Sequence, residues 1–83
     1  MYYVYIIYSA KRDRYYVGQS DNVENRIVSH NSGKSPYTSS ANDWKLVYKE
    51  EYSTRKEAIK RESAIKKKKS RKYIIWLTEQ GRH

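Results

Sequence analysis

The strongest constraint on the fold is the stretch from Tyr2 to Tyr8, in which every residue is aromatic or β-branched. Such residues favour β-strands, and a run without polar alternation predicts a strand that is buried on both faces. Ser9 to Arg14 is polar and typical of a turn, and Tyr15 to Gln19 predicts a second strand. We therefore expect the chain to begin with a β-hairpin.

A helix and a long loop are predicted next. Ser20 or Asp21 can cap a helix that continues to about residue 31, where Ser32 and Gly33 end it. Residues 33–43 contain almost no apolar side chain and therefore predict a loop. Loops of this length in compact domains usually have a function.

The rest of the chain predicts one more strand and two more helices. Trp44 to Tyr52 alternates sufficiently to form the third strand. Thr54 and Glu57 have the spacing of a capping box and start a helix that runs through about Lys68. Ser70 starts a final helix. We expect an α+β fold, with a small three-stranded antiparallel sheet flanked by helices in the order β-β-α-β-α-α.

Length and charge limit the possible classes of protein. With 83 residues, the chain is expected to form a single domain over residues 1–83. Lys and Arg outnumber Asp and Glu by 18 to 9, and the net charge of +9 predicts a partner rich in phosphate. No apolar window approaches a membrane span of about 20 residues, so we expect a cytoplasmic protein without a membrane partner.

Side-chain chemistry excludes several kinds of site. The chain has no cysteine and two histidines, His30 and the terminal His83, which are too few for a zinc or copper site. Glu50 and Glu51 are neighbours on a strand and point to opposite faces, which argues against a site with paired carboxylates. No glycine-rich loop precedes a helix, so a P-loop is unsupported. A catalytic metal would therefore be a hard ion held by oxygen.

Polar residues interrupt the apolar faces of the first two predicted helices. One stripe contains two basic side chains, and the other contains a carboxylate: the stripes are Val23, Arg26, Ile27 and His30, and Ala58, Ile59, Glu62 and Ile65. A buried charge must be paired or must bind a metal. Glu62 either pairs with Arg26 or His30 across the core or belongs to a functional site.

Five sequence elements occur in an order that resembles the GIY-YIG nucleases. Tyr3-Val4-Tyr5 and Tyr16-Val17-Gly18 resemble the paired motif that names the family, and Arg26 with His30 resembles its Arg-x-x-x-His. Glu62 looks like the metal-binding glutamate of the second helix. Two further stretches resemble a small stand-alone bacterial branch, related to the nuclease module of the excision-repair incision enzyme: His30-Asn31-Ser32-Gly33-Lys34 and Trp44-Lys45-Leu46-Val47-Tyr48. The chain differs from the family in having Tyr3 in place of a glycine and no asparagine after Asn42.

The resemblance implies a metal-dependent DNA endonuclease with a role in repair or recombination. Tyr5 would be the general base, assisted by a cationic neighbour because the pKa of a phenol is near 10. Tyr16 would position the water, and His30 would share the proton or donate to phosphate. Arg26 would clamp the scissile phosphate. Glu62 would hold one Mg²⁺ or Mn²⁺ ion, with waters and phosphate oxygens completing its coordination.

DNA is the expected partner, and single-stranded or branched DNA is favoured over a long specific duplex. We expect the nucleic acid to contact a set of basic, aromatic and hydroxyl side chains: Lys34, Tyr37, Thr38, Lys66, Lys67, Lys68, Lys69, Arg71 and Lys72. The lysine run is also compatible with a solvated helix end. Two alternatives remain: a binding module that kept the fold without catalysis, and a basic RNA-binding protein. The oligomeric state is left open.

Overall fold

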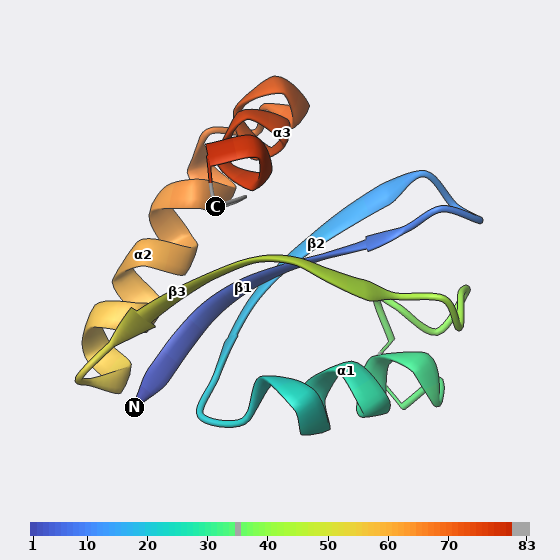
Figure 1. Ribbon diagram of the computed structural model, residues 1–83, viewed down its shortest axis with the longest axis horizontal. Helices are drawn as coiled ribbons and strands as arrows, with labels where there is room; N and C mark the ends of the chain where they lie inside the picture. Colours follow the sequence, from blue (N-terminus) through green and yellow to red (C-terminus); the bar gives the residue numbers. More distant parts are fainter. Residues whose placement is uncertain (35, 81–83) are drawn as a thin grey trace.

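The computed structural model describes residues 1–34 and 36–80, and within them it contains three strands and three helices. Their order is β1 (Tyr2–Ser9), β2 (Arg14–Ser20), α1 (Val23–Asn31), β3 (Lys45–Tyr52), α2 (Arg55–Lys67) and α3 (Arg71–Gln80) (Figure 1). This order confirms the predicted α+β class. None of the described helices is long and apolar enough to cross a membrane. His83 lies outside the described residues.

β1 is the central strand of an antiparallel sheet with the order β2-β1-β3. Its residues from Val4 to Ile7 are buried without a gap, as the absence of polar alternation predicted. In the β1–β2 ladder Tyr5 pairs with Gly18, and Ile7 pairs with Tyr16. Because side chains alternate along a strand, Tyr5, Ile7 and Tyr16 face the same side of the sheet.

The sheet separates two small apolar cores. Val4 and Ile6 pack on the side of α2 and α3, against Ala58, Ile65 and Leu77. Tyr5 and Ile7 pack on the opposite side, which α1 and the loop before β3 cover with Val23, Ala41 and Trp44. Figure 1 shows α1 on one side of the sheet and α2 with α3 on the other. This arrangement explains why β1 carries no polar face.

The start of α1 differs from the sequence prediction. Neither Ser20 nor Asp21 is the cap, because β2 continues to Ser20 and the hydroxyl of Ser20 binds the backbone of Asn22. Asn22 is extended, and its side chain accepts a hydrogen bond from the Asn25 amide at 3.1 Å. The helix ends at Ser32 and Gly33 as predicted. The capping side chain therefore lies one or two residues later in the chain than predicted.

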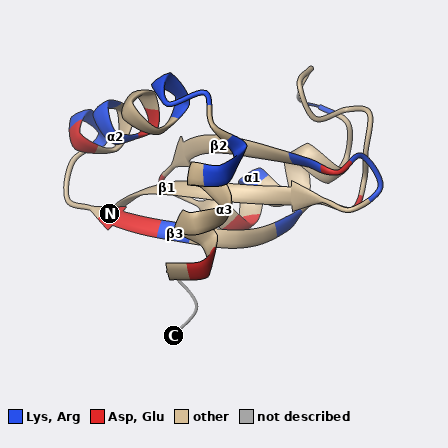
Figure 2. Cartoon of the chain, turned by 90° about the horizontal axis from the view of Figure 1, so that it is seen from above, with Lys and Arg blue, Asp and Glu red and all other residues tan. Residues whose placement is uncertain are grey.

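α2 lies beside the edge strand β2 (Figure 2). Thr54 caps the helix as predicted, with its hydroxyl accepting from the Glu57 amide at 3.2 Å. The predicted apolar stripe is narrower than expected, since Ala58 and Ile65 are buried but Ile59 is exposed. Only the side of α2 that carries Ala58 and Ile65 therefore packs against the sheet.

Candidate active site

Tyr5 and His30 are joined within the core that α1 covers. The Tyr5 hydroxyl lies 2.9 Å from Nε2 of His30. On the other side of the imidazole, Nδ1 lies 2.8 Å from the hydroxyl of Thr38. The relative exposure of the three residues is 1%, 0% and 0%. A strand, a helix and a loop thus contribute to one buried chain of hydrogen bonds.

The loop that carries Thr38 is fixed to α1 directly after His30. The indole Nε1 of Trp44 donates to the Thr38 carbonyl at 3.0 Å. The side chain of Asn31 accepts from the Trp44 amide at 2.7 Å and donates to the Trp44 carbonyl at 3.1 Å. Because Asn31 holds Trp44 and Trp44 holds the backbone of Thr38, the Thr38 side chain is kept against the imidazole.

Gly18 leaves the space that the Tyr5 phenol occupies. A Cβ atom built on Gly18 would lie 2.5 Å from the Tyr5 hydroxyl and 2.6 Å from the carbon that bears it. Real side chains do not approach so closely, so any larger residue at position 18 must displace the phenol or the strand. The glycine of the second motif is thus explained by direct contact with the tyrosine of the first.

Burial shifts the pKa of both members of this pair towards the neutral form. Burial raises the pKa of Tyr5 above its ordinary value, although the adjacent Arg26 guanidinium lowers it in part. Burial also lowers the pKa of His30, and the nearby charge of Arg26 lowers it further. At neutral pH Tyr5 is therefore a phenol and His30 a neutral imidazole. The cationic neighbour expected from the sequence is present, but it does not outweigh burial.

Tyr16 and Lys66 lie next to Tyr5 and His30 on the side of β2, and we call these four residues with Thr38 the Tyr5 cluster. The Tyr16 ring lies with its centroid 4.9 Å from that of His30. The ammonium of Lys66, which belongs to α2, lies 5.8 Å from the centroid of the Tyr16 ring. Lys66 thus extends from α2 past the edge strand to the face that carries Tyr5 and His30.

Arg26 occupies a different environment from the predicted one. Arg26 is exposed at the surface of α1, whereas His30 is buried against the sheet. The prediction that both side chains share the buried apolar face is therefore wrong for Arg26. Arg26 lines a cavity of about 340 Å³ together with Ser29, Lys34 and Pro36. Two cations, Arg26 and Lys34, therefore line an open cavity next to the buried phenol.

Glu62 pairs with neither Arg26 nor His30. One carboxylate oxygen, Oε2, accepts from Lys66 at 2.8 Å. The side chain is 18% exposed, and its negative charge raises the pKa of Tyr5, so it lies within electrostatic reach of the phenol. The cross-core ion pair considered from the sequence is thus absent from the described residues.

Glu62 offers a single carboxylate to a bound ion. The second oxygen, Oε1, has no protein donor within residues 1–34 and 36–80. No group of three or more His, Asp or Glu side chains gathers in that part of the chain to hold a metal alone. One carboxylate with waters and phosphate oxygens is a normal ligand set for Mg²⁺, which keeps several of its waters.

The predicted nucleic-acid contacts divide into surface residues and one buried residue. Thr38 is wrong as a surface contact, since its hydroxyl is fully buried on His30. Tyr37 is 84% exposed, and the remaining predicted contacts are exposed as well: Lys34, Lys66, Lys67, Lys68, Lys69, Arg71 and Lys72. Arg71 is engaged with Asp13 at 2.6 Å, which connects α3 to the β1–β2 turn.

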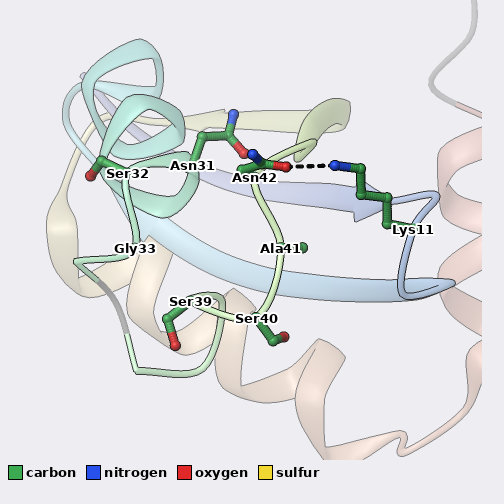
Figure 3. A pocket seen from close by; sticks show the side chains of 8 residues that line it. All are labelled: Lys11, Asn31, Ser32, Gly33, Ser39, Ser40, Ala41 and Asn42. Atoms are coloured by element: carbon green, nitrogen blue, oxygen red, sulfur yellow. Dashed lines mark hydrogen bonds between the residues drawn. The ribbon is translucent and has the colours of Figure 1, made fainter.

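A polar cavity near the end of α1 contains none of the predicted catalytic side chains (Figure 3). Its volume is about 380 Å³, and Ser32, Gly33, Ser39 and Ser40 are among its lining residues. At its margin Lys11 donates to the Asn42 side chain at 3.0 Å. A cavity of this size is therefore not by itself a marker of the cluster around Tyr5.

Comparison with known proteins identifies related sequences. Residues 1–74 match the family profile described as GIY-YIG catalytic domain. A UPF0213 protein from Staphylococcus haemolyticus is 44% identical over 66 residues, covering 78% of this chain and 79% of the relative. A UPF0213 protein from Staphylococcus saprophyticus is 35% identical, covering 94% and 95% respectively. One from Clostridium perfringens is 43% identical, covering 81% and 72%. No solved structure matches the chain.

Proposed function

Because the chain belongs to the GIY-YIG family, whose domain has a nuclease-type fold, we propose that it is a metal-dependent DNA endonuclease. The observation that supports this most directly is the contact between the Tyr5 hydroxyl and His30 at 2.9 Å, with Arg26 and Glu62 near the same phenol. A buried phenol and imidazole beside an exposed guanidinium and a partly exposed carboxylate are suited to activating water next to a phosphate.

Tyr5 is the proposed general base. It takes a proton from the attacking water while its own proton moves to Nε2 of the neutral His30, 2.9 Å away. Thr38 accepts from Nδ1–H and so keeps Nε2 free to receive that proton. The water oxygen bonds to phosphorus, the scissile P–O bond breaks, and the leaving oxygen takes a proton from solvent. This route does not require a phenolate before the substrate binds.

The other three residues are assigned to the substrate and the metal. Arg26 clamps the scissile phosphate with charge-assisted hydrogen bonds. Tyr16, beside the imidazole, positions the attacking water. Glu62 would hold one Mg²⁺ or Mn²⁺ ion, which when bound stabilises the charge that develops on the phosphate oxygens. Lys66 must then release Glu62, and an ion pair whose cation is 51% exposed is weak enough to be exchanged.

A cleavage assay with a matched pair of variants tests this proposal. Labelled single-stranded, duplex and branched DNA are incubated with the protein in Mg²⁺, Mn²⁺ or EDTA. We expect cleavage only with metal, and we expect Glu62→Gln to abolish it while DNA binding is retained. Glu79→Gln removes a carboxylate from the exposed end of α3 and should cleave normally. Cleavage by Glu62→Gln, or by the native protein in EDTA, contradicts the assignment.

The second candidate is a DNA-binding module without catalysis. The ion pair between Glu62 and Lys66 at 2.8 Å favours it, because the carboxylate is already neutralised. The raised pKa of Tyr5 favours it as well. The same assay distinguishes the endonuclease from the binding module. A binding module leaves all three DNAs uncut in Mg²⁺ and in Mn²⁺ and binds them equally well in EDTA.

A further inference from the structure

A third cavity lies beside Tyr16, at the edge of β2 and under the corner between α2 and α3. We call it the corner cavity and define it by Tyr16, Ile65, Lys69 and Ile74. Its volume is about 320 Å³, within the range of roughly 300 to 1,000 Å³ that small-molecule sites occupy. It adjoins the proposed active site but contains neither Tyr5 nor His30.

The corner cavity combines an apolar floor with a cationic rim. Val17 and Ile65 are buried at its base, and Ile74 is half-buried beside them. Lys66, Lys69 and Arg71 are exposed around it. A flat apolar ring can lie on such a floor while phosphates on either side of it meet the cations. Nucleotides have this combination of groups.

The cations of the rim are able to change partners. Lys66 pairs with Glu62 at 2.8 Å and Arg71 with Asp13 at 2.6 Å, and in each pair the cationic side chain is about half exposed. Exposed ion pairs contribute little to stability, so a phosphate can compete for either cation. Lys69 has a left-handed backbone with a φ of 47°, which is uncommon for a residue other than glycine. This turn places Lys69 at the cavity.

We propose that the corner cavity binds the base of a single unpaired nucleotide next to the scissile phosphate, so that the substrate is single-stranded DNA. This inference rests on the proposed function for the position of the scissile phosphate. The cavity with Arg26 and Lys34 shares no lining residue with the corner cavity, so a strand that reaches both meets cations at two separate places.

An unpaired base fits this site better than a paired one. In a duplex both faces of each base are stacked on neighbouring bases, and only the edges are accessible in the grooves. A base whose face lies on the apolar floor, where half-buried Ile74 is accessible, must leave that stack, which is least costly in a single strand. The cavity therefore favours unpaired substrates by its shape and not by sequence.

Binding in EDTA tests the cavity independently of cleavage. A short labelled oligothymidylate and a hairpin duplex of the same length are titrated into the ¹⁵N-labelled full chain. We expect the single strand to shift the amide signals of Tyr16, Lys69 and Ile74, and to bind more tightly than the hairpin. Shifts confined to other residues overturn the proposal.

Two pairs of variants distinguish the cavity from general electrostatics. Ile74→Trp fills the cavity, whereas Ile59→Trp adds the same ring at an exposed site on α2. Lys69→Asn removes a charge while Asn tolerates the left-handed backbone, and Lys56→Asn removes the same charge at the other end of α2. We expect each cavity variant to weaken single-strand binding about tenfold relative to its control, with hairpin binding little changed.

The outcomes separate this inference from the proposed function. If the single strand binds at the cavity but no DNA is cut in Mg²⁺ or Mn²⁺, the endonuclease proposal fails and the cavity remains. If DNA is cut but Ile74→Trp and Lys69→Asn bind like their controls, the cavity proposal fails. Should Ile74→Trp not fold, the comparison of Lys69→Asn with Lys56→Asn decides the question. An equal loss of single-strand and hairpin binding also overturns the proposal.

Discussion

Gly18 and Tyr5 are a matched pair across the β1–β2 ladder, and replacing the glycine should separate stability from activity. In Gly18→Ala the new methyl group meets the Tyr5 hydroxyl at 2.5 Å. Overpacking of this kind costs about 1–3 kcal/mol of stability. The displaced phenol also loses its hydrogen bond to His30. We expect a lower midpoint in urea unfolding and a loss of most cleavage.

The control for this substitution is Gly33→Ala at the end of α1. Gly33 has a φ of +80° and open space around its Cα, so an added methyl group causes only backbone strain of roughly 1 kcal/mol. This variant should be destabilised but should cleave normally. If both glycine variants retain full activity per folded molecule, the contact between Gly18 and Tyr5 has no functional role.

Thr38 positions His30, and its hydroxyl can be removed without changing the volume of the side chain. Thr38→Val leaves Nδ1 of His30 buried without a partner, which costs about 1–3 kcal/mol. We also expect cleavage to fall by roughly 10- to 100-fold, within the contribution of a positioned acid–base group. Thr38→Ser keeps the hydroxyl and should restore most of the activity.

The tautomer of His30 gives a readout that a purely structural role of Thr38 does not change. In the native protein Nδ1 should carry the proton and Nε2 should accept from Tyr5, which long-range ¹H–¹⁵N spectra of the imidazole can show. Thr38→Val should produce a mixture of tautomers, and Thr38→Ser should not. An unchanged tautomer in Thr38→Val would contradict the positioning role.

At the scale of the elements, α2 is fastened to β3 by a polar cluster around Glu50. Arg61 makes two hydrogen bonds to the Glu50 carboxylate, at 2.9 and 3.1 Å, and Tyr48 and Tyr52 also donate to it. Although burial acts in the opposite direction, these bonds lower the pKa of Glu50. The cluster fixes α2, and with it Glu62, relative to the sheet.

The two tyrosines of this cluster should titrate late. Burial and the hydrogen bonds to Glu50 raise the pKa of Tyr48 and of Tyr52 to about 12. Their contribution to stability is therefore fully present below the unfolded pKa of about 10 and is lost as the pH rises towards 12. Glu50→Gln should bring both titrations earlier, as ultraviolet tyrosinate absorbance can measure. Titration of all ten tyrosines near pH 10 in the native protein would contradict the cluster.

The order of the elements was predictable because their signals are local. The unbroken apolar run of β1 and the Thr54 cap of α2 depend on neighbouring residues, and both predictions are confirmed. The start of α1 was predicted wrongly, since Ser20, Asp21 and Asn22 can all act as caps, and the choice depends on where β2 ends. Glu50 was considered only as a possible member of a carboxylate pair, because Arg61 is distant from it in sequence.

At the scale of the whole molecule, the site is assembled by contacts that the sequence does not show. Periodicity indicated that His30 and Glu62 were unusual, but it placed both Arg26 and His30 in the core. In the structure His30 is buried and Arg26 is exposed. The buried role of Thr38 had no local signal, because a threonine in a polar loop is usually exposed. Its environment depends on Trp44 and α1 closing over the loop.

The net charge of +9 does not itself say where DNA binds, because lysines and arginines occur on most elements (Figure 2). The structure places five of them on two separate cavities: Arg26, Lys34, Lys66, Lys69 and Arg71. For a single strand the logarithm of the binding constant falls by about 0.7 per neutralised phosphate for each unit of log salt. Five such contacts predict a slope of roughly −3.5.

The salt dependence of the variants then shows which cations contact the strand. In EDTA, Lys69→Asn should make the slope shallower by about 0.7, whereas Lys56→Asn should leave it unchanged although both variants have the same net charge. Titration of a labelled oligothymidylate at several salt concentrations measures both slopes. Equal slopes in the two variants would mean that the strand responds to the overall charge, and affinity that is independent of salt would exclude a phosphate partner altogether. A difference confined to Lys69 would place the strand over the corner between α2 and α3, because Lys56 is at the opposite end of α2.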